Sequence, residues 1–445
     1  MTATRLANLI STIRWDTMPR SAVERAKLAV LDYLGVLFAG MSMPLSREML
    51  DNLGGPDALA RGEDFALWSG TVARIVDLDD GHRFAMGHPG VPVISGVLAS
   101  AVESTVTGPQ FLEAVIRGYE VYGFLGRVVN PPAYRERGFD STGICGAVAA
   151  AAGVASTRKP DAGEMGHAMA IAGSLCGGLT QYFEDGSSPK YLCSGWAAHL
   201  GIKAASFARH GFTGPDSIFG GKSGFCQAFS PKYDSEYLKS PRVQWEIEHS
   251  YFKKFGCVRR THAALDCIEA ICSGHGLSVD DISHIRIKCG RFVADGGKYS
   301  PKDIVAAQSS LPFSIAVLLC HGEVDLELLE RSIGDAVVEE VSRRVEVIED
   351  EEFNDLARSN PSYWNAAAVE ITDTRGTTHN QRVDLARGEA ENPFDPSTLK
   401  EKYVRLARKA VDEPEAREIM GRVMLLENVH DVGQAIAGFI RGRLL

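Results

Sequence analysis

Apolar residues in the first half of the chain recur at the three- and four-residue spacing of amphipathic helices. Residues 21–39 follow this spacing and begin with Ser21 and Glu24, which have the spacing of a capping box. A second long helix is predicted to open at Thr107, because Pro109 fits the first helical turn, where its missing N–H costs nothing. Both segments are therefore predicted to be helices.

Two segments rich in Ala and Gly, 143–156 and 195–209, place small residues three and four positions apart. Such spacing lets helices approach one another closely. The first 15 residues have an amphipathic helical pattern rather than the apolar run of a signal peptide. We therefore predict that residues 1 to about 245 form packed helices joined by loops rich in Gly and Asp.

The pattern then changes to a period of two. Residues 285–289 alternate apolar and charged side chains, as a half-buried strand requires. Residues 366–371 and 377–385 are β-prone runs on either side of a turn-forming stretch, 373–376. Residues 397–429 return to helical spacing, and their apolar stripe needs a partner surface. This last segment is predicted to pack back on the first helices.

Length and composition fit a two-domain globular chain of mainly α class. The 445 residues exceed the roughly 250–300 at which one hydrophobic core stops growing. A net charge of −10 disfavours nucleic acid as a partner, although a few Lys and Arg can still converge on an acidic substrate. The nine cysteines form no C-x-x-C pair, and the chain has no run of 18 apolar residues. We therefore predict a cytoplasmic protein that is not exported and does not span a membrane.

The densest polar cluster in the sequence contains Asp77, Asp79, Asp80, His82 and His88. Placing so many like charges close together raises the cost of ionising each one. A metal site is one interpretation, but the cluster lacks a known cation-binding loop, so no metal is predicted. A solvated acidic loop with a helix N-cap is a second. We favour the third interpretation, a catalytic loop that presents His88.

Two other motifs suggest chemistry that we exclude. Residues 214–223 approach the phosphate-loop pattern, but Asp216 stands where that pattern needs glycine, so nucleotide binding is not predicted. Cys145, Cys193 and Cys257 are interpreted as small buried side chains rather than nucleophiles.

A resemblance to a known family includes the acidic loop. The stretch from Leu67 to His82, followed by His88-Pro89-Gly90, resembles the signature of the MmgE/PrpD family. Further matches follow in the family's order: Gly118–Val121, Gly138–Gly143, Lys190–Ala198, Phe212–Pro215, Gly220–Phe225, Lys253–His262, Ala307–Phe313 and Asn392-Pro393. The matches cover nearly the whole chain.

The resemblance implies a large all-helical domain formed by both chain ends, 1–250 and 392–445, and a smaller α+β lid domain over 251–391. It also implies a homodimer with the active site between the domains. Activities of the family include 2-methylcitrate dehydratase, cis-aconitate decarboxylase and iminodisuccinate epimerase, none with an obligatory organic cofactor. We therefore expect a small polycarboxylate substrate and no cofactor.

Carried over residue by residue, the resemblance implies six site residues: Asp77, His88, Lys190, Lys253, Arg259 and His262. The Lys and Arg side chains would bind substrate carboxylates and stabilise an enolate-like intermediate. His88 would remove the α-proton with Asp77 to orient it, because an imidazole titrates near neutral pH. Lys190 is the expected second base, and His262 is also compatible with a buried core position.

Several positions depart from the family pattern. Asp140 and Phe313 replace a family His and Tyr, while Gly81 and Val258 replace a Thr and a decarboxylase His. These losses remove proton donors, so epimerisation is favoured over dehydration, although His82 or Asp140 could act as an acid. A 2-methylcitrate dehydratase-like hydro-lyase and a non-catalytic carboxylate-binding protein remain the alternatives.

Overall fold

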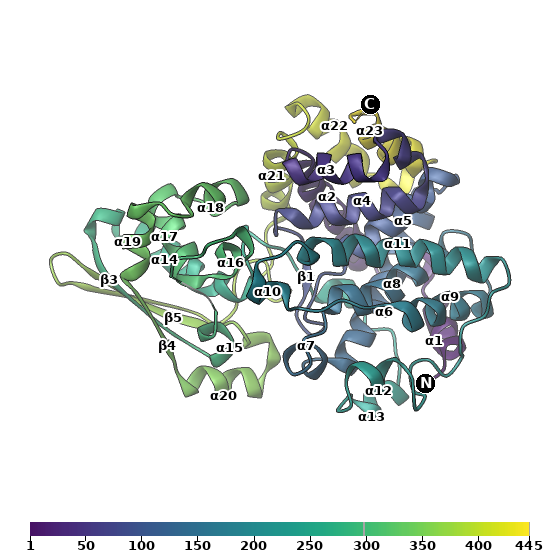
Figure 1. Ribbon diagram of the computed structural model, residues 1–445, viewed down its shortest axis with the longest axis horizontal. Helices are drawn as coiled ribbons and strands as arrows, with labels where there is room; N and C mark the ends of the chain where they lie inside the picture. The colour runs from purple at the N-terminus through teal and green to yellow at the C-terminus, as the bar shows by residue number, and fades with distance from the viewer. Residues whose placement is uncertain (297–298, 445) are drawn as a thin grey trace.

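The computed structural model describes residues 1–296 and 299–444, and helices dominate it. Figure 1 shows a larger helical body that contains both chain ends, beside a smaller part built around a sheet. This architecture confirms the mainly α class with a smaller α+β part. One hydrophobic core draws on residues 3–252 and 399–440 together with Val305 and Leu326 of the smaller part, while the second lies within 255–386.

Helices make up most of residues 3–239 of the body. Their bounds are α1 Ala3–Ile10, α2 Arg20–Met41, α3 Pro44–Leu53, α4 Gly62–Ile75, α5 Gly90–Glu103, α6 Gly108–Val129, α7 Pro132–Arg135, α8 Ser141–Ser156, α9 Ala162–Leu175, α10 Tyr182–Asp185, α11 Pro189–Arg209, α12 Phe225–Phe229 and α13 Ser235–Lys239.

The two predicted helix starts have different outcomes. The Thr107 hydroxyl accepts from the Gln110 backbone N–H and the Gln110 side chain bonds back, so α6 opens with a full capping box. The capping box predicted at Ser21 was wrong. Pro19 occupies the N-cap of α2 and makes no side-chain cap bond, because α2 already begins at Arg20. Ser21 therefore lies inside the first turn.

The Gly-rich segments let two central helices cross at very short range. A Cβ added to Gly195 of α11 would lie 2.2 Å from the Leu67 carbonyl oxygen of α4. A Cβ at Gly70 of α4 would lie 2.9 Å from the Gly195 Cα. This crossing fixes α4 against α11, and the loop with the acidic cluster follows directly from α4.

The C-terminal segment packs on the body as predicted. It forms α21 Pro396–Ala407, α22 Glu413–Met424 and α23 Gly438–Gly442. The Tyr403 ring of α21 meets Phe38 of α2 edge to face at 6.5 Å. The Lys402 ammonium lies 2.6 Å from the Asp32 carboxylate, which gives this packing a buried ion pair.

The smaller part contains a four-stranded sheet in the order β4-β3-β5-β6. Its strands are β3 Ile282–Cys289, β4 Val345–Glu349, β5 Ala367–Asp373 and β6 Thr378–Val383, and its helices are α14 His262–His275, α15 Arg291–Ala294, α16 Ile304–Ser309, α17 Leu311–His321, α18 Leu326–Ser332, α19 Ala336–Arg343 and α20 Glu351–Ser359. The short strands β1 Gly81–His82 and β2 Ser250–Tyr251 form a separate antiparallel pair in the body.

The predicted strand and hairpin are confirmed. Strands β5 and β6 pair antiparallel, and the Asp373 carboxylate accepts from the Arg375 and Thr377 backbone N–H groups to hold the turn. Strand β4 was not predicted. It pairs parallel with β3 through a connection of several helices, so no local turn signal in the sequence marks the pairing.

Within the described ranges, no single helix combines the length and apolar character needed to cross a membrane. The pair α2 and α3, which meet at a bend of 87°, reaches that length and composition only when taken together.

The α4–α11 crossing generates a stability prediction. Replacing Gly195 with Ala places a methyl group against backbone atoms, so we expect the free energy of unfolding to fall by about 1–3 kcal/mol. Gly274→Ala in α14 is the matched control, because nothing lies within 4 Å of its added Cβ. Urea unfolding followed by circular dichroism measures both. Equal stability of the two variants would contradict the close crossing.

Candidate active site

The acidic cluster lies on the loop that joins α4 to α5. Asp77, directly after α4, has a positive φ of 52°, which is uncommon for a residue with a side chain. Strained backbone of this kind is often found at functional sites. Further along the loop, Gly81 and His82 pair with Tyr251 and Ser250, so the loop is anchored beside the segment that leads into the smaller part.

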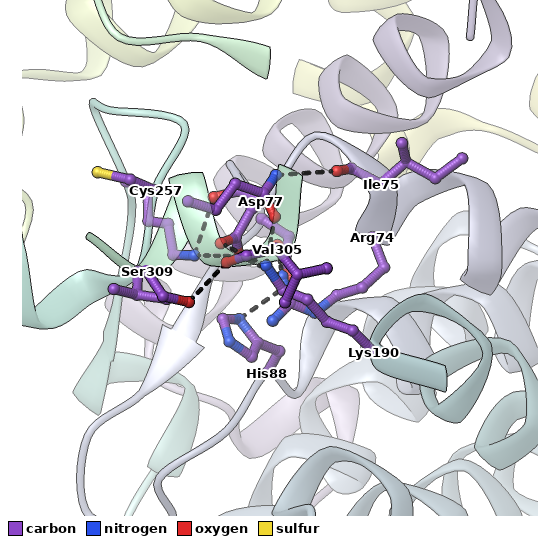
Figure 2. A network of polar contacts seen from close by, with 12 residues as sticks. Arg74, Ile75, Asp77, His88, Lys190, Cys257, Val305 and Ser309 are labelled. Carbon is purple, nitrogen blue, oxygen red and sulfur yellow. Dashed lines mark hydrogen bonds and ion pairs between the residues drawn. The ribbon is translucent and has the colours of Figure 1, made fainter. Parts of the chain in front are cut away.

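The Asp77 carboxylate is the centre of a buried cluster of cations. Arg74 lies 2.5 Å from Oδ1 and Lys253 2.7 Å from the same oxygen, while Lys190 lies 3.1 Å from Oδ2. Burial alone would raise the pKa of Asp77, but Lys190, Lys253 and Arg74 together hold it well below its usual range. Figure 2 shows Arg74 and Lys190 reaching Asp77 from different elements. Asp77 is therefore a permanent counter-ion.

His88 lies next to this cluster, and one of its ring nitrogens contacts two acceptor groups of the protein. Its Nδ1 is 2.6 Å from the Asp80 carbonyl oxygen and 3.0 Å from the Asp79 carboxylate. Because both neighbours are acceptors, Nδ1 carries the proton and donates it. Burial and the Arg74 charge lower the pKa of His88, which keeps the imidazole neutral. Nε2 therefore holds a lone pair and can act as a base.

Asp80 fixes the end of the loop in a different way. Its carboxylate accepts from the Tyr119 hydroxyl at 2.7 Å and from the Gly90 backbone N–H at 3.0 Å. Burial raises the pKa of Asp80 to about 7. The Asp80 carbonyl and carboxyl groups thus position His88 and the start of α5, while Asp79 supplies the charge beside the imidazole.

A cavity of about 1630 Å³ opens in front of these side chains, and His88, Asp77, Arg74, Lys253 and Arg259 line it. Its lining includes nine Lys and Arg side chains against seven Asp and Glu. Three of these cations pair with glutamates outside the lining, so the wall is close to neutral although the whole chain has a net charge of −10. The cations without such a partner are available to small anions.

Arg259 lies in the cavity wall, and most of its guanidinium N–H groups already have hydrogen-bond acceptors in the protein. Nε donates to Glu389 at 2.9 Å and Nη1 to the Arg387 carbonyl at 3.1 Å, and the group also faces the Tyr251 ring at 4.7 Å. Its Nη1 lies 3.0 Å from His262 Nδ1. Most donors of Arg259 therefore hold the wall together.

Lys190 and His262 lie behind the wall rather than on the cavity surface. Lys190 is fully buried, and its ammonium contacts Asp77 and the Gln308 side-chain oxygen. Burial lowers the pKa of Lys190 to about 8. The pKa of His262 lies well below its usual value because of burial and the Arg259 charge. Lys190 stabilises Asp77, and this placement does not present it as a second base.

The two residues considered as acids, His82 and Asp140, also lie outside the cavity lining. The buried His82 ring pairs with Glu246 through Nε2 at 2.9 Å. Asp140 is the N-cap of α8, where it accepts from the Thr142 backbone N–H and from the Tyr182 hydroxyl, both at 2.8 Å. Both side chains are committed to holding the fold.

Sequence reasoning assigned the wrong carboxylate to His88. The imidazole contacts Asp79, whereas Asp77 turns toward the three cations. The sequence pattern did not single out Arg74, although it lies within the stretch from Leu67 to His82. Arg74 donates hydrogen bonds to both Asp77 and Asp79. The i to i+3 spacing of Arg74 and Asp77 at a helix end was the signal that could have found this pair.

Comparison with known proteins identifies the family of the chain. The chain matches the MmgE/PrpD N-terminal domain over residues 4–238 and the MmgE/PrpD C-terminal domain over residues 255–426. The chain belongs to the MmgE/PrpD family. It is 23% identical to a cis-aconitate decarboxylase-like protein, oryM, of Aspergillus oryzae, over 99% of this chain and 97% of that protein. It is 22% identical to cis-aconitate decarboxylase of Aspergillus terreus, over 95% of this chain and 92% of that protein.

The Asp77 cluster generates a second prediction. Asp77→Asn leaves three cations without their shared counter-ion, so we expect a loss of about 3–5 kcal/mol in the free energy of unfolding. The double variant Asp77→Asn/Lys190→Met removes one cation as well and should recover part of that loss. Urea unfolding of the wild type, Asp77→Asn, Lys190→Met and the double variant measures the difference. A double variant as unstable as the sum of its single changes would contradict the mutual neutralisation.

Proposed function

We propose that this protein is an enzyme that removes a proton from a carbon α to a carboxylate of a small di- or tricarboxylic acid. The observation that carries the proposal is the geometry of His88. Its Nδ1 proton is held by Asp80 and Asp79, so the neutral Nε2 is free to accept a proton in a cavity that Arg74 and Lys253 also line. Family membership supports an enzymatic role.

The cationic wall supplies the second requirement of this chemistry. Removing an α-proton leaves negative charge on the adjoining carboxylate, and fixed positive charges in a water-poor site lower the cost of that charge. Lys253 and Arg74 line the cavity and are held in place by Asp77. Three cations and two carboxylates, Asp77 and Asp79, leave this cluster with one excess positive charge beside neutral His88.

Among the possible outcomes of proton removal, we favour delivery of a proton to the opposite face of the same carbon, which is epimerisation of an iminodisuccinate-like substrate. Expulsion of a hydroxyl group needs an acid placed at the leaving oxygen, whereas epimerisation needs only a proton donor on the other face of the carbanion, and the Lys253 ammonium in the cavity wall can serve as that donor. The two side chains considered as acids, His82 and Asp140, are held in structural hydrogen bonds outside the cavity lining.

A lyase reaction is the second candidate. The specific observation in its favour is that the two relatives described above carry names of cis-aconitate decarboxylases and align with this chain over nearly its full length. The hydro-lyase alternative, a 2-methylcitrate dehydratase-like reaction, belongs to the same class and would produce a new conjugated C=C bond.

The proposal predicts His88-dependent exchange of the α-proton. Incubation with enantiopure dicarboxylates in deuterated water should introduce deuterium at the α-carbon, which proton NMR measures. The His88→Asn substitution should slow this exchange about 100-fold or more. The exposed His210→Asn is the control and should exchange at the wild-type rate. Exchange with inversion supports the epimerase, whereas absorbance from a new C=C or release of carbon dioxide supports a lyase. Undiminished exchange in His88→Asn would refute the proposal.

The pH profile gives an independent prediction. His88 works as a base only when neutral, and its pKa lies below the ordinary 6.5, so the rate should be constant near pH 7 and fall in more acidic solution. The Asp79 carboxylate opposes that lowering, so Asp79→Asn should move the acidic limb to still lower pH. Initial rates across the acidic range measure this shift. A limb that stays in place or moves to higher pH would contradict this effect of Asp79 on His88.

A further inference from the structure

The cavity is larger than a small dicarboxylate requires. Its volume of about 1630 Å³ exceeds the roughly 300–1,000 Å³ of common small-molecule pockets. Part of the wall comes from three short segments: α7 of the body, and the turn Arg259–Thr261 and α15 of the smaller part. Figure 1 places α7 and α15 where the two parts of the molecule meet.

Two arginines from these segments face the same aromatic ring. The Arg135 guanidinium lies 4.1 Å from the centre of the Phe292 ring, and the Arg260 guanidinium lies 5.8 Å from it. Trp364 packs against Phe292 with ring centres 5.4 Å apart. All four side chains line the cavity, so an aromatic platform holds two positive charges at its surface.

These two arginines differ from the other cationic side chains of the wall. Arg83, Arg127 and Arg259 pair with Glu391, Glu246 and Glu389. Among the residues that the structure describes, neither Arg135 nor Arg260 has a carboxylate within ion-pair distance.

Arg260 also has few hydrogen-bond acceptors. It donates to the Ser309 carbonyl oxygen at 3.3 Å. Its buried Nε has no hydrogen-bond partner in the described ranges. A guanidinium with so few acceptors keeps donors that an incoming anion can bind.

The two arginines are continuous with the His88 site. Burial raises the pKa of Tyr134 to about 12, and the charges of Arg260 and Arg74 both oppose that rise. Tyr134, which precedes Arg135 in α7, lines the same cavity as Arg74, His88 and Arg260. A ligand of sufficient length can therefore contact both regions.

We propose that Arg135 and Arg260 form a second anion subsite, which binds a carboxylate or phosphate group of the substrate in addition to the carboxylates beside His88. This inference rests on the proposed function and narrows its substrate class to molecules with a further anionic group. Arg135 comes from the body and Arg260 from the smaller part, so the subsite draws on both.

Calorimetric titration with three non-reacting probes tests the subsite. Succinate carries two carboxylates, tricarballylate adds a third, and phosphonosuccinate adds a phosphonate in its place. We expect the wild type to bind at least one of the two trianionic probes about tenfold or more tightly than succinate, as a charge-assisted contact predicts. The tighter of the two identifies the kind of anion that the subsite prefers. Equal affinity for all three probes would overturn the proposal.

Substitution of the two arginines tests whether they cause the preference for the probe with the additional anionic group. Arg135→Met and Arg260→Met should each remove most of the preference for the trianionic probe and leave succinate affinity unchanged. Arg358→Met is the matched control, because Arg358 lines the same cavity but pairs with Glu351 and Asp355. Thermal unfolding of each variant checks that it is folded. A preference that survives in both test variants, or that Arg358→Met also abolishes, would overturn the assignment.

The outcome is separable from that of the proposed function. If α-proton exchange requires His88 but the trianionic preference is insensitive to Arg135 and Arg260, the second subsite is wrong and the proton-transfer proposal stands. If the preference depends on the two arginines but His88→Asn exchanges normally, anion binding is retained and the catalytic proposal fails.

Discussion

The buried contact between Asp77 and three cations holds the centre of this protein together. Asp77 follows α4, Lys190 comes from α11, and Lys253 lies where the chain enters the smaller part. Burying these charges is tolerable only because each ion has a partner at short range. Lys190 also bonds Gln308 of α16, so the cluster joins the helical body to the smaller part.

The same cluster sets the chemistry available to His88. Arg74 bonds both Asp77 and Asp79, which places positive charge near the imidazole and favours its neutral form. The Asp80 carbonyl and Asp79 carboxylate hold the Nδ1 proton and leave Nε2 free. Structural stability and the proposed proton abstraction therefore depend on one set of contacts, in which Asp77 neutralises the cations and Asp79 orients the imidazole.

The composition of the cavity wall separates binding groups from supporting ones. Arg83, Arg127 and Arg259 are matched by glutamates and maintain the shape of the wall. Arg135 and Arg260 face Phe292 without a carboxylate partner in the described part of the chain. Unmatched positive charge in a partly buried cavity is available to an anionic ligand, which is why these two side chains bear on substrate class.

The sequence by itself determined the features that depend on local spacing. Helical periodicity and the Thr107 cap predicted α6, alternation predicted β3, and the Asp-containing turn predicted the β5–β6 hairpin. It also singled out the acidic loop and, through the family resemblance, Lys190 and Lys253, two of the three cations that gather around Asp77. Only the tertiary structure decided which carboxylate serves His88, because neighbouring side chains on a strained loop point in different directions. The parallel β3–β4 pair and the tethering of His82 by Glu246 join residues far apart in sequence, which no local pattern records.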